Sequence, residues 1–434
     1  MPSTAVTADL FLGIDMGTSA CRVMAIDGDG AVAGQSSAPL PPPQRNGRHV
    51  EQQASLWWIA LTAAVAQLGA QVPLRHVRAL AVDGTSGTLL LVNVHGDPVT
   101  PALMYNDTRS SAEALRISAV APPDSGAHGA TSALAKLLYL QRRYALPHGW
   151  RAMHQADWII ACLCGHVGVS DENNALKLGY DPVTRGWPTW VVGLVGDRES
   201  LPEVVPPGTP LAPVTASVAK ALNLDADVRV IAGTTDSVAA FIASGAAQPG
   251  EAVTSLGSTL VLKIISPTPV YAAEFGVYSH RLGEQWLVGG ASNSGGAVLR
   301  QFFNDGELET LSMAIRTGVP SGLDYYPLTA PGERFPVNDP SLPPRLTPRP
   351  HEPALFLQGM LEGIAKIELQ GYRCLARLGA PYPVSVRSVG GGARNEAWSE
   401  IRRGMLGVPL IDPLSREAAY GAALLSRDGY IQLQ

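Results

Sequence analysis

An acidic residue stands just before a turn of small, hydroxylated residues near the start of the chain. Asp15 precedes the turn Gly17-Thr18-Ser19, and apolar runs flank it within residues 10–26. Glycine lets backbone come close to a ligand, hydroxyl groups can bond phosphate oxygens, and an aspartate beside such a turn can hold a hydrated Mg²⁺. An ordinary glycine-containing hairpin would have the same pattern, so this segment alone allows both interpretations.

The same pattern returns late in the chain. Residues 253–265 again predict strand, turn and strand, with Gly257-Ser258-Thr259 at the turn. Two hairpins with the same pattern suggest two related halves of the chain that could bind a polyphosphate from opposite sides. The repeat is short, and it gains weight from the motifs that lie between and after its copies.

Composition favours a two-domain protein of the soluble, globular class. The chain has 434 residues, a length that exceeds what one hydrophobic core usually serves. Of these residues, 46% are hydrophobic and 16% are charged. A net charge of −5 argues against a nucleic-acid partner. No apolar run is long enough for a membrane span, no signal peptide is visible, and the four cysteines form no CxxC pair. We therefore expect a cytoplasmic location and no membrane partner.

The alternation of apolar patterns along the chain predicts an α/β fold. A proline-rich loop is expected over 199–214, and no P-loop or HExxH motif is present. The other expected elements are strands at 78–83, 89–93 and 228–232 and helices at 55–68, 108–117, 131–144, 155–164 and 237–246.

Six short motifs occur in a fixed order. They are Asp15–Ser19, Asp83-Gly-Thr-Ser-Gly-Thr88, Tyr105-Asn-Asp-Thr-Arg109, Gly233-Thr-Thr-Asp236, Gly257–Thr259 and Gly390-Gly-Gly-Ala-Arg-Asn395. With these motifs the chain resembles the FGGY family of carbohydrate kinases over nearly its whole length. The resemblance implies the two-domain, ribonuclease H-like fold shared by sugar kinases, actin and Hsp70, with the active site in the interdomain cleft. It implies an N-terminal domain over 1–242, a C-terminal domain over 243–414, and a last helix, 415–434, that packs back on the first domain.

The resemblance also implies roles for two aspartates. Asp236 would be the general base that takes a proton from the sugar hydroxyl, and Asp15 would hold Mg²⁺ through waters and also touch the sugar. Asp236 follows a buried strand and begins a helix, and from the residues alone this position favours a cap on that helix.

ATP would be bound by glycine-rich segments from both halves. The resemblance places Gly17, Thr18 and Ser19 near the β- and γ-phosphates and Gly257, Ser258 and Thr259 opposite them. Gly391 and Gly392 would let adenosine lie against bare backbone, with Asn395 at the adenine edge and Trp398 packed beneath it. The alternatives are a flexible glycine loop and a core tryptophan.

The sugar end of the site distinguishes members of the family. The Asp83–Thr88 stretch resembles the D-ribulose kinase branch, whereas xylulokinases carry Gln-Met-His-Gly and glycerol kinases Asn-Gln-Arg-Glu there. Ser86 and Asp107 are the candidates for binding sugar hydroxyls, although Asp107 could instead pair with Arg109 and brace its loop.

The resulting hypothesis is an ATP- and Mg²⁺-dependent D-ribulose kinase, monomeric or homodimeric. Its rivals are a xylulokinase or another polyol kinase of the same family, and a nucleotide-binding sensor on the actin-like fold with no sugar chemistry.

Overall fold

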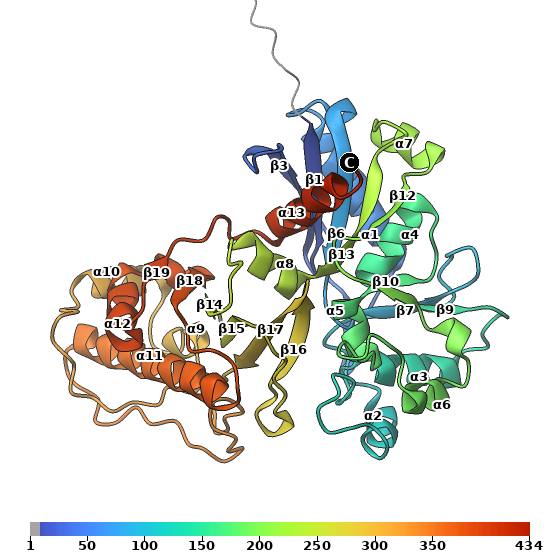
Figure 1. Cartoon of the computed structure of the whole chain (residues 1–434). Helices are drawn as coiled ribbons and strands as arrows, with labels where there is room; N and C mark the ends of the chain where they lie inside the picture. Colours follow the sequence, from blue (N-terminus) through green and yellow to red (C-terminus); the bar gives the residue numbers. More distant parts are fainter. Residues whose placement is uncertain (1–8) are drawn as a thin grey trace, which may run out of the picture. The chain divides into compact units, whose positions relative to one another are not determined.

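The computed structural model describes residues 9–434 and divides into two compact units. The first contains the described residues up to Ala243 together with Glu417–Gln434, and the second contains Ser244–Arg416 (Figure 1). The end of the chain therefore returns to the unit that holds the first strands.

A six-stranded sheet with strand order β12-β13-β6-β1-β2-β3 forms the centre of the first unit. The neighbours β1, β6 and β13 run parallel, whereas β2, β3 and β12 are antiparallel to the strands beside them. Since parallel strands end at the same edge of a sheet, residues at the carboxyl ends of β1, β6 and β13 share one edge. The strands are β1 (Leu10–Met16), β2 (Ala20–Ile26), β3 (Val32–Pro39), β6 (Val77–Gly84), β12 (Pro210–Pro213) and β13 (Arg229–Thr235).

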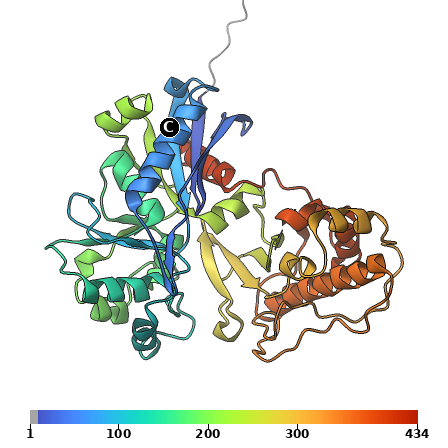
Figure 2. The same ribbon diagram turned by 180° about the vertical axis from the view of Figure 1, so that it is seen from behind.

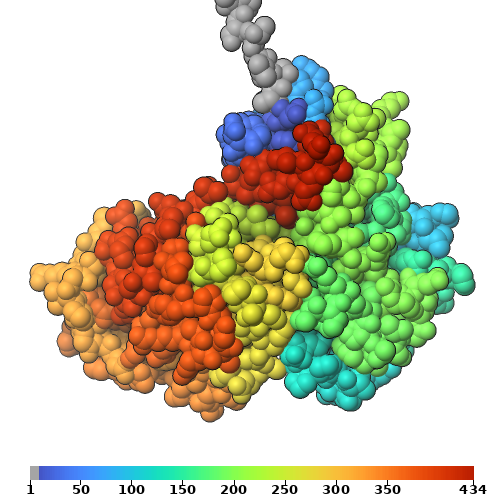
Figure 3. Space-filling view, in the orientation of Figure 1, coloured from blue at the N-terminus to red at the C-terminus, as the bar shows by residue number. Residues whose placement is uncertain are grey.

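Alternation along the central strands directs side chains to two layers of helices. Leu12 and Ile14 of β1 pack with α1 (Ala54–Leu68), α4 (Gln155–Cys164) and α7 (Ala216–Leu222). Figure 2 shows α1 crossing this face of the sheet. Phe11 and Ala81 face the other way, onto α13 (Ala418–Ile431), which also packs against α8 (Asp236–Ala243). In the space-filling view of Figure 3, the red C-terminal helix lies over the blue N-terminal strands.

A second sheet of the first unit has the order β4-β5-β8-β7-β9 and is covered by α2, α3 and α6. The segment predicted as a loop over 199–214 contains two short strands, β11 and β12, so that prediction was wrong in part. The bounds are β4 (Gln44–Asn46), β5 (His49–Gln52), β7 (Leu89–Val92), β8 (Ala102–Leu103), β9 (Arg151–His154), β10 (Val169–Asp171), β11 (Glu203–Val205), α2 (Ser111–Ser118), α3 (Ala133–Arg143), α5 (Glu172–Ala175) and α6 (Thr189–Val195).

The second unit repeats the core arrangement of the first. Its sheet has the order β16-β17-β15-β14-β18-β19, in which β14 pairs antiparallel with β15 and parallel with β18, as β1 does with β2 and β6. The long helix α11 and α12 bury their apolar sides in one core with this sheet. The elements are β14 (Glu251–Leu256), β15 (Leu260–Ser266), β16 (Tyr278–Leu282), β17 (Gln285–Ala291), β18 (Ser385–Val389), β19 (Leu410–Ile411), α9 (Gly296–Leu299), α10 (Asp305–Met313), α11 (Pro353–Arg377) and α12 (Glu396–Leu406).

The expected strand-and-helix alternation is confirmed. The helix predicted over 155–164 matches α4, and the helices expected at 55–68 and 131–144 correspond to α1 and α3 with small shifts at their ends. Within residues 9–434, no helix combines the length and apolarity that a membrane crossing would need.

Candidate functional site

Carboxylates stand at the carboxyl ends of all three parallel strands of the first unit. Asp15 of β1 is the direct register partner of Asp83 of β6, and Asp236 follows the last residue of β13, which lies beside β6. Side chains an even number of positions apart on a strand point to the same face of the sheet. Asp15 therefore lies on the face of Phe11, and Asp83 on that of Ala81, which is the face covered by α8 and α13. Strand pairing and side-chain alternation therefore bring these acidic groups together.

The charges around this edge are only partly balanced. Arg22, which is paired with Asp15 across the hairpin, donates from Nη1 to Asp15 Oδ2 at 3.1 Å. Asp83 is fully buried. No N–H or hydroxyl group of the described residues donates to its oxygens, and its side-chain hydrogen bond is with the Asp15 carboxyl group. Burial, followed by the carboxylates of Asp15 and Asp236, raises the pKa of Asp83 well above its ordinary value.

Asp236 lies where a strand turns directly into a helix. β13 can approach β6 closely at Gly233, where a Cβ would lie 1.7 Å from the Val82 carbonyl oxygen. α8 begins at Asp236, whose Oδ1 accepts a hydrogen bond from Ser237 N at 2.6 Å. The residue is only half-buried. Its carboxylate therefore accepts a hydrogen bond from the next residue at the start of the helix, and it also stays accessible, as a general base requires.

The loop after β6 is held by a network of hydroxyl groups. Gln155 Oε1 accepts from Thr85 N at 2.9 Å and from Thr85 Oγ1 at 2.7 Å. The hydroxyls of Thr85 and Thr88 lie 2.6 Å apart, and Thr88 Oγ1 accepts from Tyr105 N. Ser86 Oγ is buried and is the hydroxyl in this loop without a protein partner among the described residues. A ligand hydroxyl could satisfy it.

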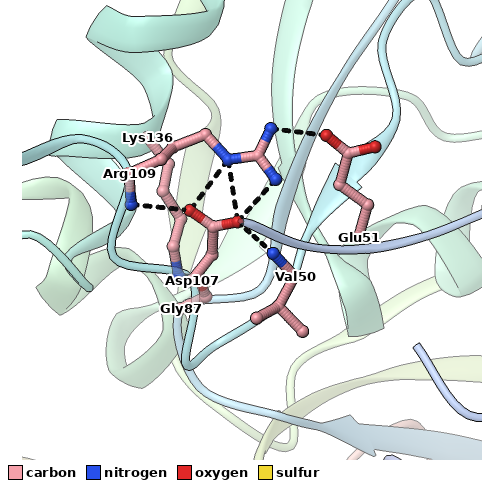
Figure 4. Close-up of polar contacts among 6 residues, drawn as sticks. All are labelled: Val50, Glu51, Gly87, Asp107, Arg109 and Lys136. Atoms are coloured by element: carbon pink, nitrogen blue, oxygen red, sulfur yellow. Dashed lines mark hydrogen bonds and ion pairs between the residues drawn. The ribbon is translucent and has the colours of Figure 1, made fainter. Parts of the chain in front are cut away.

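Asp107 is surrounded by donors from its own unit, as Figure 4 shows. Its Oδ1 accepts from Arg109 N, and its Oδ2 accepts from Val50 N at 2.6 Å and lies 2.7 Å from Arg109 Nη2. Arg109 also pairs with Glu51 at 2.5 Å, and Asp107 is fully buried. This geometry favours the alternative in which Asp107 braces its loop, because both oxygens are used internally, and it does not favour direct sugar contact.

The two glycine turns have similar surroundings in their separate units. Thr18 is half-buried and Ser19 is exposed, whereas Ser258 and Thr259 are both exposed, although the flanking strands are largely buried. In the second unit, Gly257 and Ser258 offer their carbonyl oxygens to the backbone N–H groups of residues 296 and 297. The turns therefore present polar groups to solvent at the ends of largely buried strands.

The glycines after β18 lie on a tryptophan. Gly390 has a φ of +84°, and a Cβ on Gly392 would lie 2.4 Å from the ring of Trp398. Trp398 is 1% exposed within the core of the second unit, as the core alternative expected, so it supports the glycine backbone from below and offers no surface for direct contact with a base.

Asn395, expected at the adenine edge, has a structural task. Its Oδ1 accepts from Trp398 N at 3.0 Å as the N-cap of α12, and its Nδ2 donates to Ser312 Oγ at 2.8 Å. Because both polar atoms of this side chain already form hydrogen bonds, it can bond a nucleobase only if the hydrogen bond to Ser312 breaks.

Four residues at the site were not foreseen as such: Arg22, Lys136, Gln155 and Lys177. Antiparallel register could have revealed Arg22, because the hairpin places it opposite Asp15. Gln155 and Lys177 reach the Thr85–Gly87 loop from segments about 70 and 90 positions away in the chain, and no local pattern marks them.

A buried aspartate positions the segment that carries Lys177, and its protonation should affect stability. Asp171 Oδ1 accepts from Asn173 N and Asn174 N and thereby caps α5. Burial, and secondarily Asp157, raises the pKa of Asp171 to about 7. Because the folded-state pKa is raised, the stability that this group contributes is present at low pH and is lost as pH rises through about 7.

We therefore compare the free energy of unfolding of the wild type with that of Asp171→Asn. The difference, wild type minus variant, should fall between about pH 4 and pH 7 and stay constant above pH 7. Urea titrations across this range measure it, with Asp124→Asn at an exposed carboxylate as the control. A difference that stays constant with pH would contradict a raised pKa at Asp171.

Comparison with known families decides the class of this site. Residues 10–243 match the model of the N-terminal domain of the FGGY family of carbohydrate kinases, and residues 252–426 match that of its C-terminal domain. The chain belongs to the FGGY family of carbohydrate kinases. It is therefore an ATP-dependent sugar kinase, a phosphotransferase whose acceptor is a sugar.

Curated relatives of this FGGY kinase include several named xylulose kinase. That of Staphylococcus epidermidis is 26% identical over 97% of this chain and 88% of its own length. That of Escherichia coli is 25% identical over 90% of this chain and 84% of its own. An autoinducer-2 kinase of Yersinia enterocolitica is 25% identical over 98% of this chain and 87% of its own length. These names differ in substrate, so membership alone does not fix the sugar.

Solved structures share the fold of this FGGY kinase. A xylulose-type kinase from Brucella ovis has a TM-score of 0.88 at 24% identity and covers 98% of this chain and 91% of its own. A gluconate kinase from Lactobacillus acidophilus has a TM-score of 0.84 at 18% identity, over 98% of this chain and 90% of its own. The two-domain fold expected from the motifs is thereby confirmed.

Proposed function

We propose that this FGGY kinase transfers the γ-phosphate of ATP to a primary hydroxyl of a pentulose, and that D-ribulose is the preferred acceptor. The observation that carries the proposal is the buried Ser86 hydroxyl without a protein partner, on a loop that begins at the acidic edge of the sheet. A buried hydroxyl that lacks a partner is costly unless a ligand completes it. The Asp83–Thr88 stretch also resembles the D-ribulose branch and lacks the Gln-Met-His-Gly of typical xylulokinases.

Asp236 is the proposed general base. It is half-buried at the start of α8, so its carboxylate can reach a ligand while the helix keeps it in place. It would accept the proton of the attacking sugar hydroxyl as the oxygen forms its bond to phosphorus. Asp15, held by Arg22 at 3.1 Å, would fix the orientation of the sugar and of the metal's water shell.

The donor set at the acidic edge fits Mg²⁺. This ion keeps most of its waters and needs only one or two carboxylates beside the phosphates of ATP. Asp15 provides such a carboxylate, directly before the turn Gly17-Thr18-Ser19. When bound, the ion neutralises charge on the phosphates of ATP.

Nucleotide binding is proposed for the glycine turns. Gly17–Ser19 in the first unit and Gly257–Thr259 in the second would donate backbone N–H groups and hydroxyls to phosphate oxygens. Gly391, where an added Cβ would meet nothing within 4 Å, and Gly392 would carry the adenosine on bare backbone. Trp398 and Asn395 would act from beneath, by supporting Gly392 and by capping α12.

The first test is ADP release with Mg·ATP and a panel of D-ribulose, L-ribulose, D-xylulose, L-xylulose, ribitol and glycerol. We expect D-ribulose to give the highest kcat/KM. A higher value for D-xylulose would replace the proposed substrate by the one in the names of several relatives, and it would leave the kinase chemistry intact.

The second test removes the Ser86 hydroxyl. Ser86→Ala should raise KM for the pentulose about tenfold, the effect of one lost hydrogen bond to a bound ligand, with KM for ATP unchanged. Thr18→Ala is the comparison, since its effect should appear in KM for ATP. If Ser86→Ala binds the sugar as wild type does, the hydroxyl is not a sugar ligand.

A further inference from the structure

Two lysines from separate elements meet consecutive carbonyl groups of the loop after β6. Lys136 of α3 donates from Nζ to the Gly87 carbonyl oxygen at 2.6 Å, and Lys177, in the 3₁₀ turn Leu176–Leu178, donates to the Ser86 carbonyl oxygen at 3.3 Å. Figure 4 shows Lys136 and Gly87 beside the Asp107 cluster. The two ammonium groups therefore hold the peptide on either side of the Ser86–Gly87 bond.

The same lysines enclose the loop sterically. Gly87 has a φ of +85°, and a Cβ there would lie 3.1 Å from Lys177 Cδ. Lys136 is fully buried and Lys177 half-buried. Together with the bonds from Gln155 to Thr85, these contacts fix the loop backbone on both sides of Ser86. The Ser86 hydroxyl is then the side-chain hydroxyl of this loop that has no protein partner among the described residues and can bond a ligand.

Stability alone does not explain this arrangement. Among the described residues Lys136 forms no ion pair, and its ammonium lies near a second one. Burial, and then the charge of Lys177, lowers the pKa of Lys136 to about 7. A buried lysine without an ion-pair partner is costly to keep, because burial disfavours its charged form, so a role in the site is the better explanation.

We propose that Lys136 and Lys177 are positioning residues that hold the Ser86–Gly87 backbone so that the Ser86 hydroxyl is aimed at the sugar. The inference deepens the proposed function and rests on it where Ser86 contacts the pentulose. Neither lysine is assigned to the reacting atoms; each acts through the loop.

Kinetics of Lys136→Met and Lys177→Met test this role, because methionine keeps the length of the apolar stem and removes the ammonium. Each variant should raise KM for the pentulose by up to about tenfold, the effect expected for loss of the Ser86–sugar hydrogen bond, with kcat and KM for ATP close to wild type. In a protein that already carries Ser86→Ala, the same lysine substitutions should raise KM for the pentulose little further, because the lysines act through Ser86. Lys220→Met, at an exposed lysine of α7, is the matched control.

A second measurement is independent of turnover. The amides of Thr85 and Thr88, which donate to Gln155 Oε1 and to the Thr85 carbonyl oxygen, should exchange hydrogen about tenfold faster in both lysine variants than in Lys220→Met. Thermal unfolding of the same samples shows whether the change is local.

The outcomes separate the two ideas. Unchanged exchange at these amides, or KM effects that simply multiply with that of Ser86→Ala, overturns the positioning role. Faster local exchange in a protein that phosphorylates none of the sugars keeps the lysine support of the loop and overturns the proposed substrate class.

Discussion

Asp236→Ala should lower kcat by a factor of about 10² or more while nucleotide binding stays close to wild type. A positioned general base contributes about 10²–10⁴ to proton-transfer catalysis, and alanine leaves no group to accept the proton of the sugar hydroxyl. The glycine turns proposed to bind ATP in the second unit lie on separate elements, β14, β15 and β18, which this change does not touch. Coupled ADP release measures kcat, and titration calorimetry with ATP measures binding.

Two further variants make that result specific. Asp236→Asn keeps the shape of the side chain and an oxygen that can accept from Ser237 N, so α8 stays anchored while the base is lost. It should be nearly as inactive as Asp236→Ala. Asp29→Ala removes an exposed carboxylate of the same unit and should retain wild-type kcat. Turnover of Asp236→Asn within a few-fold of wild type would move the base to another residue, and Asp15 would be the next candidate.

The parts of the site that were predictable from sequence are those built within one hairpin or at one strand end. The apolar run before Asp15 and the turn after it predict β1 and β2, and alternation then gives the face on which Asp15 projects. Asp236 was identifiable for the same reason, because a buried strand and a helical pattern meet at that residue. Short-range patterns dictate these features.

The roles that changed depend on contacts between distant segments. Asp107 could have faced a sugar, but Val50 N and Glu51, more than fifty positions earlier, come to lie beside it and Arg109. Trp398 proved to be a core residue because Gly392 leaves room for its ring. Lys136 stands in an apolar helical stretch, where a lone lysine gives no sign that a carbonyl of a distant loop will meet it.

Gly13→Ala should destabilise the first unit by about 3 kcal/mol, at the upper end of overpacking effects. A Cβ on Gly13 would lie 1.8 Å from the Ala419 carbonyl oxygen and 2.2 Å from Ala423 N, both in the backbone of α13. Backbone cannot rotate away as a side chain can, so the whole helix would have to move. The melting temperature should fall by about 6 °C or more for a unit of this size.

The position of Gly13 gives this change a second consequence. It lies two residues before Asp15 on the same face of β1, and α13 packs against α8, which begins at Asp236. A displaced α13 should therefore lower kcat even at temperatures where the protein stays folded. Scanning calorimetry and kinetics below the transition measure the two effects. Gly28→Ala, where nothing lies within 4 Å of the new methyl group, is the control. If Gly13→Ala melts and turns over like that control, α13 does not rest on β1 in solution as it does in this structure.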